Sequence, residues 1–144
     1  MIRFFNSILI LLLLSSCQNK IETNTTLSNE DLQRIKNIKL LEKDEKIIQF
    51  YSEFKNKIAG NFYTNKRIAS YWLDERDTLK NKVEFAYFKD IIKLEPFYKV
   101  GLTYCPYILV TKSNNETFKV CVDGTEKEKQ SFYVEAVKMW KKNK

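Results

Sequence analysis

The chain has 144 residues, of which 44% are hydrophobic and 30% are charged, with 25 Lys and Arg against 18 Asp and Glu. This length supports one domain with a hydrophobic core, and the composition excludes a disordered or collagen-like chain. Because the chain has no His, it lacks the commonest general base and the commonest zinc ligand.

The first segment has the three parts of a secretory signal peptide. Arg3 is the only charge before Lys20, and an apolar stretch follows it up to Leu14. Small residues then stand where a signal peptidase would cut. The stretch is shorter than the ~20 residues that a membrane-spanning helix needs.

The motif Leu14-Ser15-Ser16-Cys17 resembles the lipobox of bacterial lipoproteins. The resemblance implies that residues 1–16 are removed and that the Cys17 thiol carries diacylglycerol, so that acyl chains hold the protein on the membrane. In well-studied diderm bacteria, an Asp directly after the lipidated cysteine retains a lipoprotein in the inner membrane. This chain has Gln18 at that position. The resemblance therefore favours the outer membrane, with the protein on its periplasmic side. Two alternatives stay open: an ordinary secretory signal that contains a cysteine, and a short uncut anchor.

Residues 17–27 are predicted to form a lipidated tether, and residues 28–144 a single domain. The tether is polar without strong periodicity, and it would span ~15–20 Å as a flexible coil. Ser28 then has the position of a helix N-cap. Apolar residues at helical spacing predict two helices, or one kinked helix, across 28–59, with Gly60 at a left-handed C-cap.

The middle of the chain changes to the period of strands. Apolar and polar residues alternate over 83–87, 98–104 and 118–122, and more weakly over 68–73. Residues 113–115 suit a hairpin turn, whereas residues 83–95 could be strand or helix. Thr125 and Glu128 form a capping box before a final helix. The expected fold is α+β, with N-terminal helices, an antiparallel meander of three to four strands and a C-terminal helix. Cone-shaped folds of the nuclear-transport-factor-2 type also fit this order.

The two remaining cysteines, Cys105 and Cys121, form an even pair in a chain that is predicted to be exported. A disulfide between them would close a loop of about 15 residues and stabilise the fold by ~3 kcal/mol in the chain-entropy model. The alternative is two separately packed thiols. Two Cys without His do not complete a zinc tetrahedron on their own, so no metal and no cofactor are predicted.

The sequence offers little catalytic chemistry. The three glycines are scattered and form no phosphate-binding loop. The densest carboxylate cluster is Asp74-Glu75-Arg76-Asp77, which could bind a hard cation or serve acid–base chemistry. Alternatively it is a solvated turn whose Asp side chains accept backbone N–H groups. We assign no catalytic residue, although Lys-based and carboxylate-only enzymes exist.

Most of the positive charge of the chain comes from lysine. Only four of the 25 basic residues are Arg, and nucleic-acid recognition tends to use the Arg fork, so no nucleic acid is expected. The basic C-terminus, residues 138–144, could meet anionic lipid or an acidic partner, or could simply complement a helix dipole.

Two functions are consistent with these features. The first is a protein-binding module on the membrane, either an immunity-type inhibitor or an accessory subunit of an envelope assembly. The second is a small-ligand binder or His-free enzyme with a pocket in a curved sheet. That pocket would be lined by Tyr87, Tyr98, Tyr104 and Tyr107.

Overall fold

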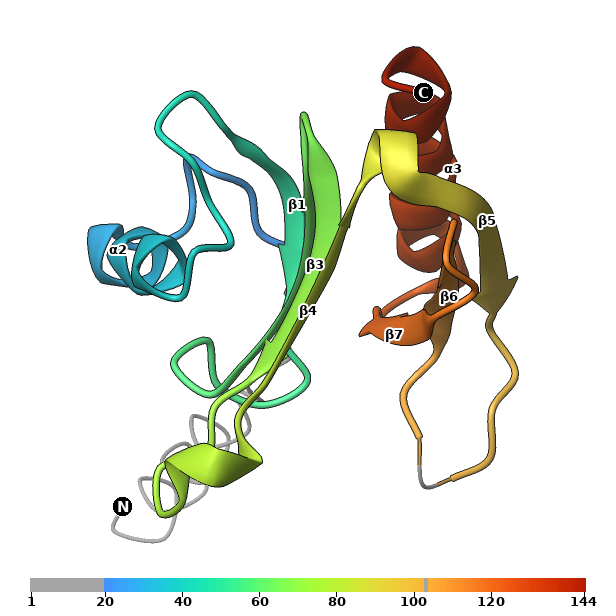
Figure 1. Ribbon diagram of the computed structural model, residues 1–144. Helices are drawn as coiled ribbons and strands as arrows, with labels where there is room; N and C mark the ends of the chain where they lie inside the picture. The colour runs from blue at the N-terminus through green and yellow to red at the C-terminus, as the bar shows by residue number, and fades with distance from the viewer. Residues whose placement is uncertain (1–19, 103) are drawn as a thin grey trace, which may run out of the picture.

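The computed structural model describes residues 20–102 and 104–144 (Figure 1). The predicted signal peptide and Cys17 lie outside the described residues. The fold is α+β, as predicted, but it has two antiparallel sheets rather than one meander. Among the described residues, no helix is long and apolar enough to cross a membrane.

Each sheet is a meander of consecutive strands. The first sheet contains β1 (Ile47–Tyr51), β2 (Ala59–Thr64), β3 (Arg67–Trp72) and β4 (Lys82–Tyr87). The second sheet contains β5 (Ile91–Phe97), β6 (Tyr107–Lys112) and β7 (Thr117–Cys121). The helices are α2 (Asn29–Asn37), α3 (Glu126–Lys142) and the short 3-10 turns η2 (Thr78–Lys80) and η3 (Phe88–Asp90).

The first sheet is the middle layer of the molecule (Figure 1). One of its faces packs on α2 and the residues around it, in a core that includes Ile35, Phe50 and Phe62. Its other face packs on the second sheet and α3, in a core that includes Tyr63 and Phe132. Side chains therefore fill the space between the two sheets.

Helix α3 begins as the sequence predicts. Thr125 is the N-cap, and its side chain and that of Glu128 form the reciprocal capping box. The helix packs on β5, where the Trp140 Nε1–H donates to the Ile91 carbonyl oxygen at 3.1 Å. The Phe132 ring meets Tyr63 edge-on, with 5.1 Å between ring centroids. The helix thereby ties the second sheet to the first.

The two helices, or one kinked helix, predicted across 28–59 are confirmed only over Asn29–Asn37, where Ser28 is the N-cap. The prediction is wrong beyond Asn37, because residues 47–51 and 59–64 are strands. Strand β2 is buried along its whole length, since both faces of the middle layer are covered. A register shift between Ile47 and Gln49 interrupts β1. Neither strand therefore shows the period of two that identifies a half-buried strand.

Gly60 is a strand residue and not the predicted C-cap. A Cβ atom at this position would lie 2.3 Å from Cε1 of Tyr71 and 2.7 Å from Cε2 of Phe50. The two aromatic rings lie directly over the backbone, and only glycine leaves room for them.

The strand predicted over 98–104 is also wrong. Its described residues, 98–102 and 104, belong to the loop that joins β5 to β6, and the strands lie on either side of this loop. Residues 83–95 resolve as β4, η3 and the first part of β5. The predicted turn at 113–115 is confirmed between β6 and β7, with Asn115 at a positive φ of 68°.

Part of the predicted tether lies against the domain. Glu22 forms a two-way backbone bridge with Phe50 of β1, with both N···O distances 2.8 Å. Leu27 is buried in the core beneath α2. Residues 22–27 therefore extend the folded unit at the edge of the first sheet.

Candidate interaction surface

The acidic segment Asp74-Glu75-Arg76-Asp77 is a hydrogen-bonded turn, the second of the two expected alternatives. Asp74 Oδ1 accepts from the backbone N–H of Arg76 at 2.8 Å and of Asp77 at 3.0 Å. Asp77 in turn caps η2, and Glu75 forms an ion pair with Lys57. Within the described ranges, no three His, Cys, Asp or Glu side chains form a metal cluster.

The four tyrosines of the expected pocket do not converge. The Tyr87 hydroxyl donates to Glu42 at 2.7 Å beside the first sheet, while Tyr107 is on β6 of the second sheet. Tyr98 and Tyr104 lie in the β5–β6 loop. An open hollow of about 650 Å³ exists elsewhere, and its lining contains none of the four tyrosines. It is lined by Trp72, Asp74, Leu79, Lys80, Asn81 and Lys82.

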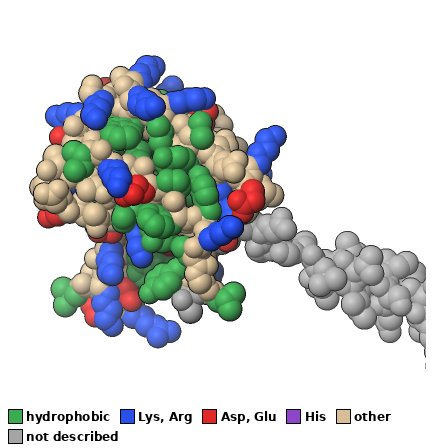
Figure 2. Space-filling model, turned by 90° about the vertical axis from the view of Figure 1, so that its right-hand side faces the viewer, with side chains coloured by type: hydrophobic (Ala, Val, Ile, Leu, Met, Phe, Trp, Pro, Cys, Tyr) green, Lys and Arg blue, Asp and Glu red, His purple; other side chains and the backbone are tan. Residues whose placement is uncertain are grey.

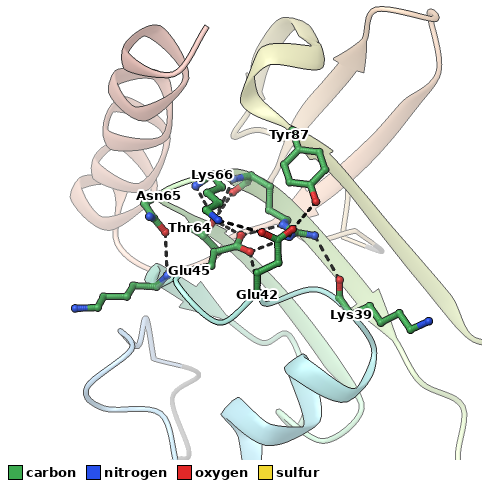
Figure 3. A network of polar contacts seen from close by, with 9 residues as sticks. Lys39, Glu42, Glu45, Thr64, Asn65, Lys66 and Tyr87 are labelled. Atoms are coloured by element: carbon green, nitrogen blue, oxygen red, sulfur yellow. Dashed lines mark hydrogen bonds and ion pairs between the residues drawn. The ribbon is translucent and has the colours of Figure 1, made fainter.

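The most polar cluster surrounds Arg67, which is 1% exposed (Figure 3). Its Nε donates to Glu45 Oε1 and its Nη2 to Glu45 Oε2, both at 2.8 Å, and Nη2 also reaches Glu42 at 2.7 Å. The guanidinium lies over the rings of Phe85 and Tyr87, at 5.0 and 4.5 Å from their centroids. Arg67 and Glu45 form the buried part of this network and Glu42 its surface part, so the network holds the α2–β1 connection on the sheet.

Glu42 is the exposed member of this network. Hydrogen bonds from Tyr87 and then from Lys66 lower its pKa from 4.5 to about 2. The sequence does not predict this cluster, because Glu45 and Glu42 stand 22 and 25 positions before Arg67 and no spacing pattern connects them.

The outer face of the second sheet carries a cluster of exposed aromatic side chains. Phe97 and Tyr107 are cross-strand partners, and their rings stack with centroids 5.1 Å apart. Lys119 Nζ lies 4.5 Å from the Tyr107 ring centroid and 5.0 Å from that of Tyr104. Leu109, half-buried, follows Tyr107 on the same face of β6. We call these five residues the outer-face cluster.

Figure 2 looks at the molecule from the side of the second sheet. Hydrophobic side chains gather across the middle of this face, and Lys and Arg side chains surround them. The sheet presents an apolar centre with a charged rim, which is the arrangement typical of protein–protein interfaces.

Cys105 and Cys121 lie at disulfide distance beside the outer-face cluster, with their Cα atoms 5.8 Å apart. Cys121 is the cross-strand partner of Tyr107. The backbone N–H of Cys121 donates to Asn61 Oδ1 of the first sheet at 2.8 Å. The pair therefore joins the end of the β5–β6 loop to β7, where the second sheet meets the first.

Comparison with known proteins gives a fold class. No family model matches the chain, and no curated protein matches it. The chain is similar to a DUF1696 family protein with a pleckstrin-homology domain from Shewanella loihica PV-4, whose crystal structure was solved at 2.00 Å. The two share 14% sequence identity over 87% of this chain and 97% of that one, with a TM-score of 0.53.

At this level of identity the likeness concerns the fold alone. The chain shares its overall fold with that protein, and in this chain two antiparallel sheets pack together with a C-terminal helix. The expected analogy with cone-shaped folds of the nuclear-transport-factor-2 type does not hold, because a second sheet takes the place of a single curved one.

Proposed function

We propose that this protein is a lipoprotein of the bacterial envelope, anchored through Cys17, whose domain binds another protein through the outer-face cluster. The observation that carries the proposal is the stacked pair Phe97 and Tyr107 on an open sheet face, with Lys119 over Tyr107. Aromatic residues supply much of the binding energy at protein interfaces.

The cluster is ordered before any partner arrives. Phe97 is 39% exposed, yet its ring is already stacked on Tyr107 at 5.1 Å. A partner that covers these rings gains apolar burial without having to immobilise free side chains, which otherwise opposes association. The cysteine pair lies beside Tyr107, at the same end of the second sheet.

The lipoprotein part of the proposal rests on the motif Leu14-Ser15-Ser16-Cys17 and is tested by intact mass. We expect protein extracted from membranes to lack residues 1–16 and to carry added acyl mass. An uncut chain without acyl mass would overturn the anchor.

The binding part is tested by photo-crosslinking in intact cells. We expect a photoreactive residue at Leu109, inside the cluster, to give a discrete adduct that Phe97→Ala removes. The matched control is the same residue at Glu84, which is exposed on β4 of the other sheet. Equal adducts at the two positions, or none at Leu109, would overturn the proposed surface.

The nature of the adduct distinguishes the two kinds of partner. An immunity-type inhibitor captures a toxin and is dispensable when that toxin is absent. An accessory subunit is crosslinked to a resident component of the envelope in every growth condition.

A further inference from the structure

Three loops lie at the same end of the domain, the lower end in Figure 1, with the β3–β4 loop on one side and the β5–β6 loop on the other. They are the β1–β2 loop (residues 52–58), the β3–β4 loop (73–81) and the β5–β6 loop (98–106). Asn61 connects the ends of the two sheets, because its Nδ2 donates to Glu53 at 2.5 Å and its Oδ1 accepts from the Cys121 N–H at 2.8 Å. We call this region the loop end.

Among its described residues, the loop end exposes several large apolar side chains. Leu79 is 93% exposed on η2, and Leu102 is fully exposed in the β5–β6 loop. Phe54 and Trp72 are also exposed, and their rings stack with centroids 6.4 Å apart. Exposed apolar side chains that lie close together, as Phe54 and Trp72 do, are typical of interaction sites.

Lysines are interleaved with these apolar side chains. Lys55 Nζ lies 5.4 Å from the Phe54 ring centroid. Lys80 and Lys82 line the open hollow together with Trp72, Leu79 and one acidic residue, Asp74. Figure 2 shows basic, acidic and hydrophobic side chains side by side at the lower end of the molecule. Tryptophan, aliphatic tips and lysine are the side chains that suit the boundary between water and an anionic bilayer.

The N-terminal segment approaches the domain from the loop end. Asn24 donates its N–H to Ile47 at the start of β1, whereas Glu22 pairs with Phe50 near the end of that strand. Glu22 also accepts from Asn56 of the β1–β2 loop at 2.8 Å. Going back along the chain from Asn24 to Glu22 therefore leads toward the loop end.

The distance from the anchor to this point is short. Cys17 precedes Glu22 by five positions, and five fully extended residues span at most ~17 Å. If Cys17 carries the acyl chains, the loop end stays within this reach of the bilayer.

The basic C-terminus lies at the opposite end. Trp140 bonds to Ile91, at the start of β5, and β5 ends at the loop end with Phe97. Figure 1 shows the C-terminus at the top of the molecule and the three loops at the bottom. The short link to Cys17 therefore favours the loop end, and not residues 138–144, as the side that meets the membrane.

We infer that the loop end rests on the surface of the bilayer that holds Cys17, with Leu79, Leu102 and Trp72 in the headgroup region. This inference rests on the proposed lipidation. It leaves α3 pointing away from the membrane and the outer-face cluster open to a partner from the side.

The two tryptophans of the chain allow a test with the full acylated protein. Trp72 lies at the loop end and Trp140 at the far end, so Trp140→Phe and Trp72→Phe each leave one reporter. Each variant is reconstituted in phosphatidylethanolamine and phosphatidylglycerol vesicles whose acyl chains carry bromine near the headgroup. Because interfacial side chains reach ~5–10 Å into this boundary, we expect Trp72 fluorescence to fall by about half while Trp140 fluorescence changes little.

Further variants test whether the exposed leucines of the loop end cause the quenching, and the intact mass shows whether the protein is acylated. Leu79→Ser with Leu102→Ser, both at exposed positions, should reduce the quenching of Trp72. The matched exposed pair Ile92→Ser with Val134→Ser, outside the three loops, should not. Acylated protein whose Trp72 is unquenched, or whose Trp140 is quenched equally, would overturn the docking and leave the lipoprotein proposal standing. Protein without acyl mass would overturn both.

Discussion

Arg67 is a fully buried cation whose guanidinium is matched by two carboxylates and two aromatic rings. Arg67→Ala would leave Glu45, itself 4% exposed, buried without its counter-charge. Breaking a buried pair in this way lowers the free energy of unfolding by ~3–5 kcal/mol, which urea denaturation followed by circular dichroism measures. The control Arg76→Ala, at an exposed position, should change it by less than ~0.5 kcal/mol. Equal effects would show that the network does not stabilise the fold.

Glu42 makes stability depend on pH in the acid range. Its pKa is about 2 in the folded protein against an ordinary 4.5, so below pH 4.5 the unfolded chain binds a proton that the folded chain does not. The contribution of Glu42 is therefore complete above pH 4.5 and is lost as the pH falls toward 2. Denaturation measured between these pH values should show that the free energy of unfolding falls less with decreasing pH in Glu42→Gln than in the parent protein. Tyr87→Phe removes the main cause of the lowered Glu42 pKa, so its pH dependence should lie between those of the parent and Glu42→Gln. Three identical pH profiles would show that Glu42 does not cause the acid dependence.

Strand β2 depends on glycine at one position. In Gly60→Ala the added Cβ would meet the Tyr71 ring at 2.3 Å, and overpacking of a filled core costs ~1–3 kcal/mol or more. Gly101→Ala is the matched control, because a Cβ there would have no atom within 4 Å. We expect thermal unfolding to shift downward for the first variant and to stay within error for the second. If the Gly60→Ala variant kept the parent's midpoint, the ring would not occupy the position described.

The elements that could be predicted are those with one exposed face. In β4 and β7, and in α3 with its capping box, polar residues mark the solvent side, so the period is visible in the sequence. Strand β2 is buried on both faces, and its period is hidden. Residues 98–104 show the opposite failure: they alternate like a strand, but none of the described residues in this range belongs to a strand, and Leu102 points to solvent.

At the scale of the whole molecule, the candidate surfaces depend on register and loop position. Phe97, Tyr107 and Lys119 come from three strands, and only the pairing of β5 with β6 and of β6 with β7 makes them neighbours. The β3–β4 loop, with Leu79, and the β5–β6 loop, with Leu102, lie at the same end of the molecule because their strands end on that side of the two packed sheets (Figure 1). The sequence contains these residues, but it does not show where the fold places them relative to one another. The cysteine pair could be predicted because two cysteines remain in a chain whose signal motif predicts export.

That pair supports the last prediction, which concerns the stability of the whole domain. A bond between Cys105 and Cys121, 16 positions apart, restricts the unfolded chain, so the double variant Cys105→Ser with Cys121→Ser should lose ~3 kcal/mol of unfolding free energy. Reduction of the parent should give the same loss, and the reductant should have no effect on the double variant. Alkylation of both thiols in unreduced protein would contradict the bond. Because the bond anchors the loop of Leu102 and borders Tyr107, its loss should also weaken both the crosslink at Leu109 and the quenching of Trp72.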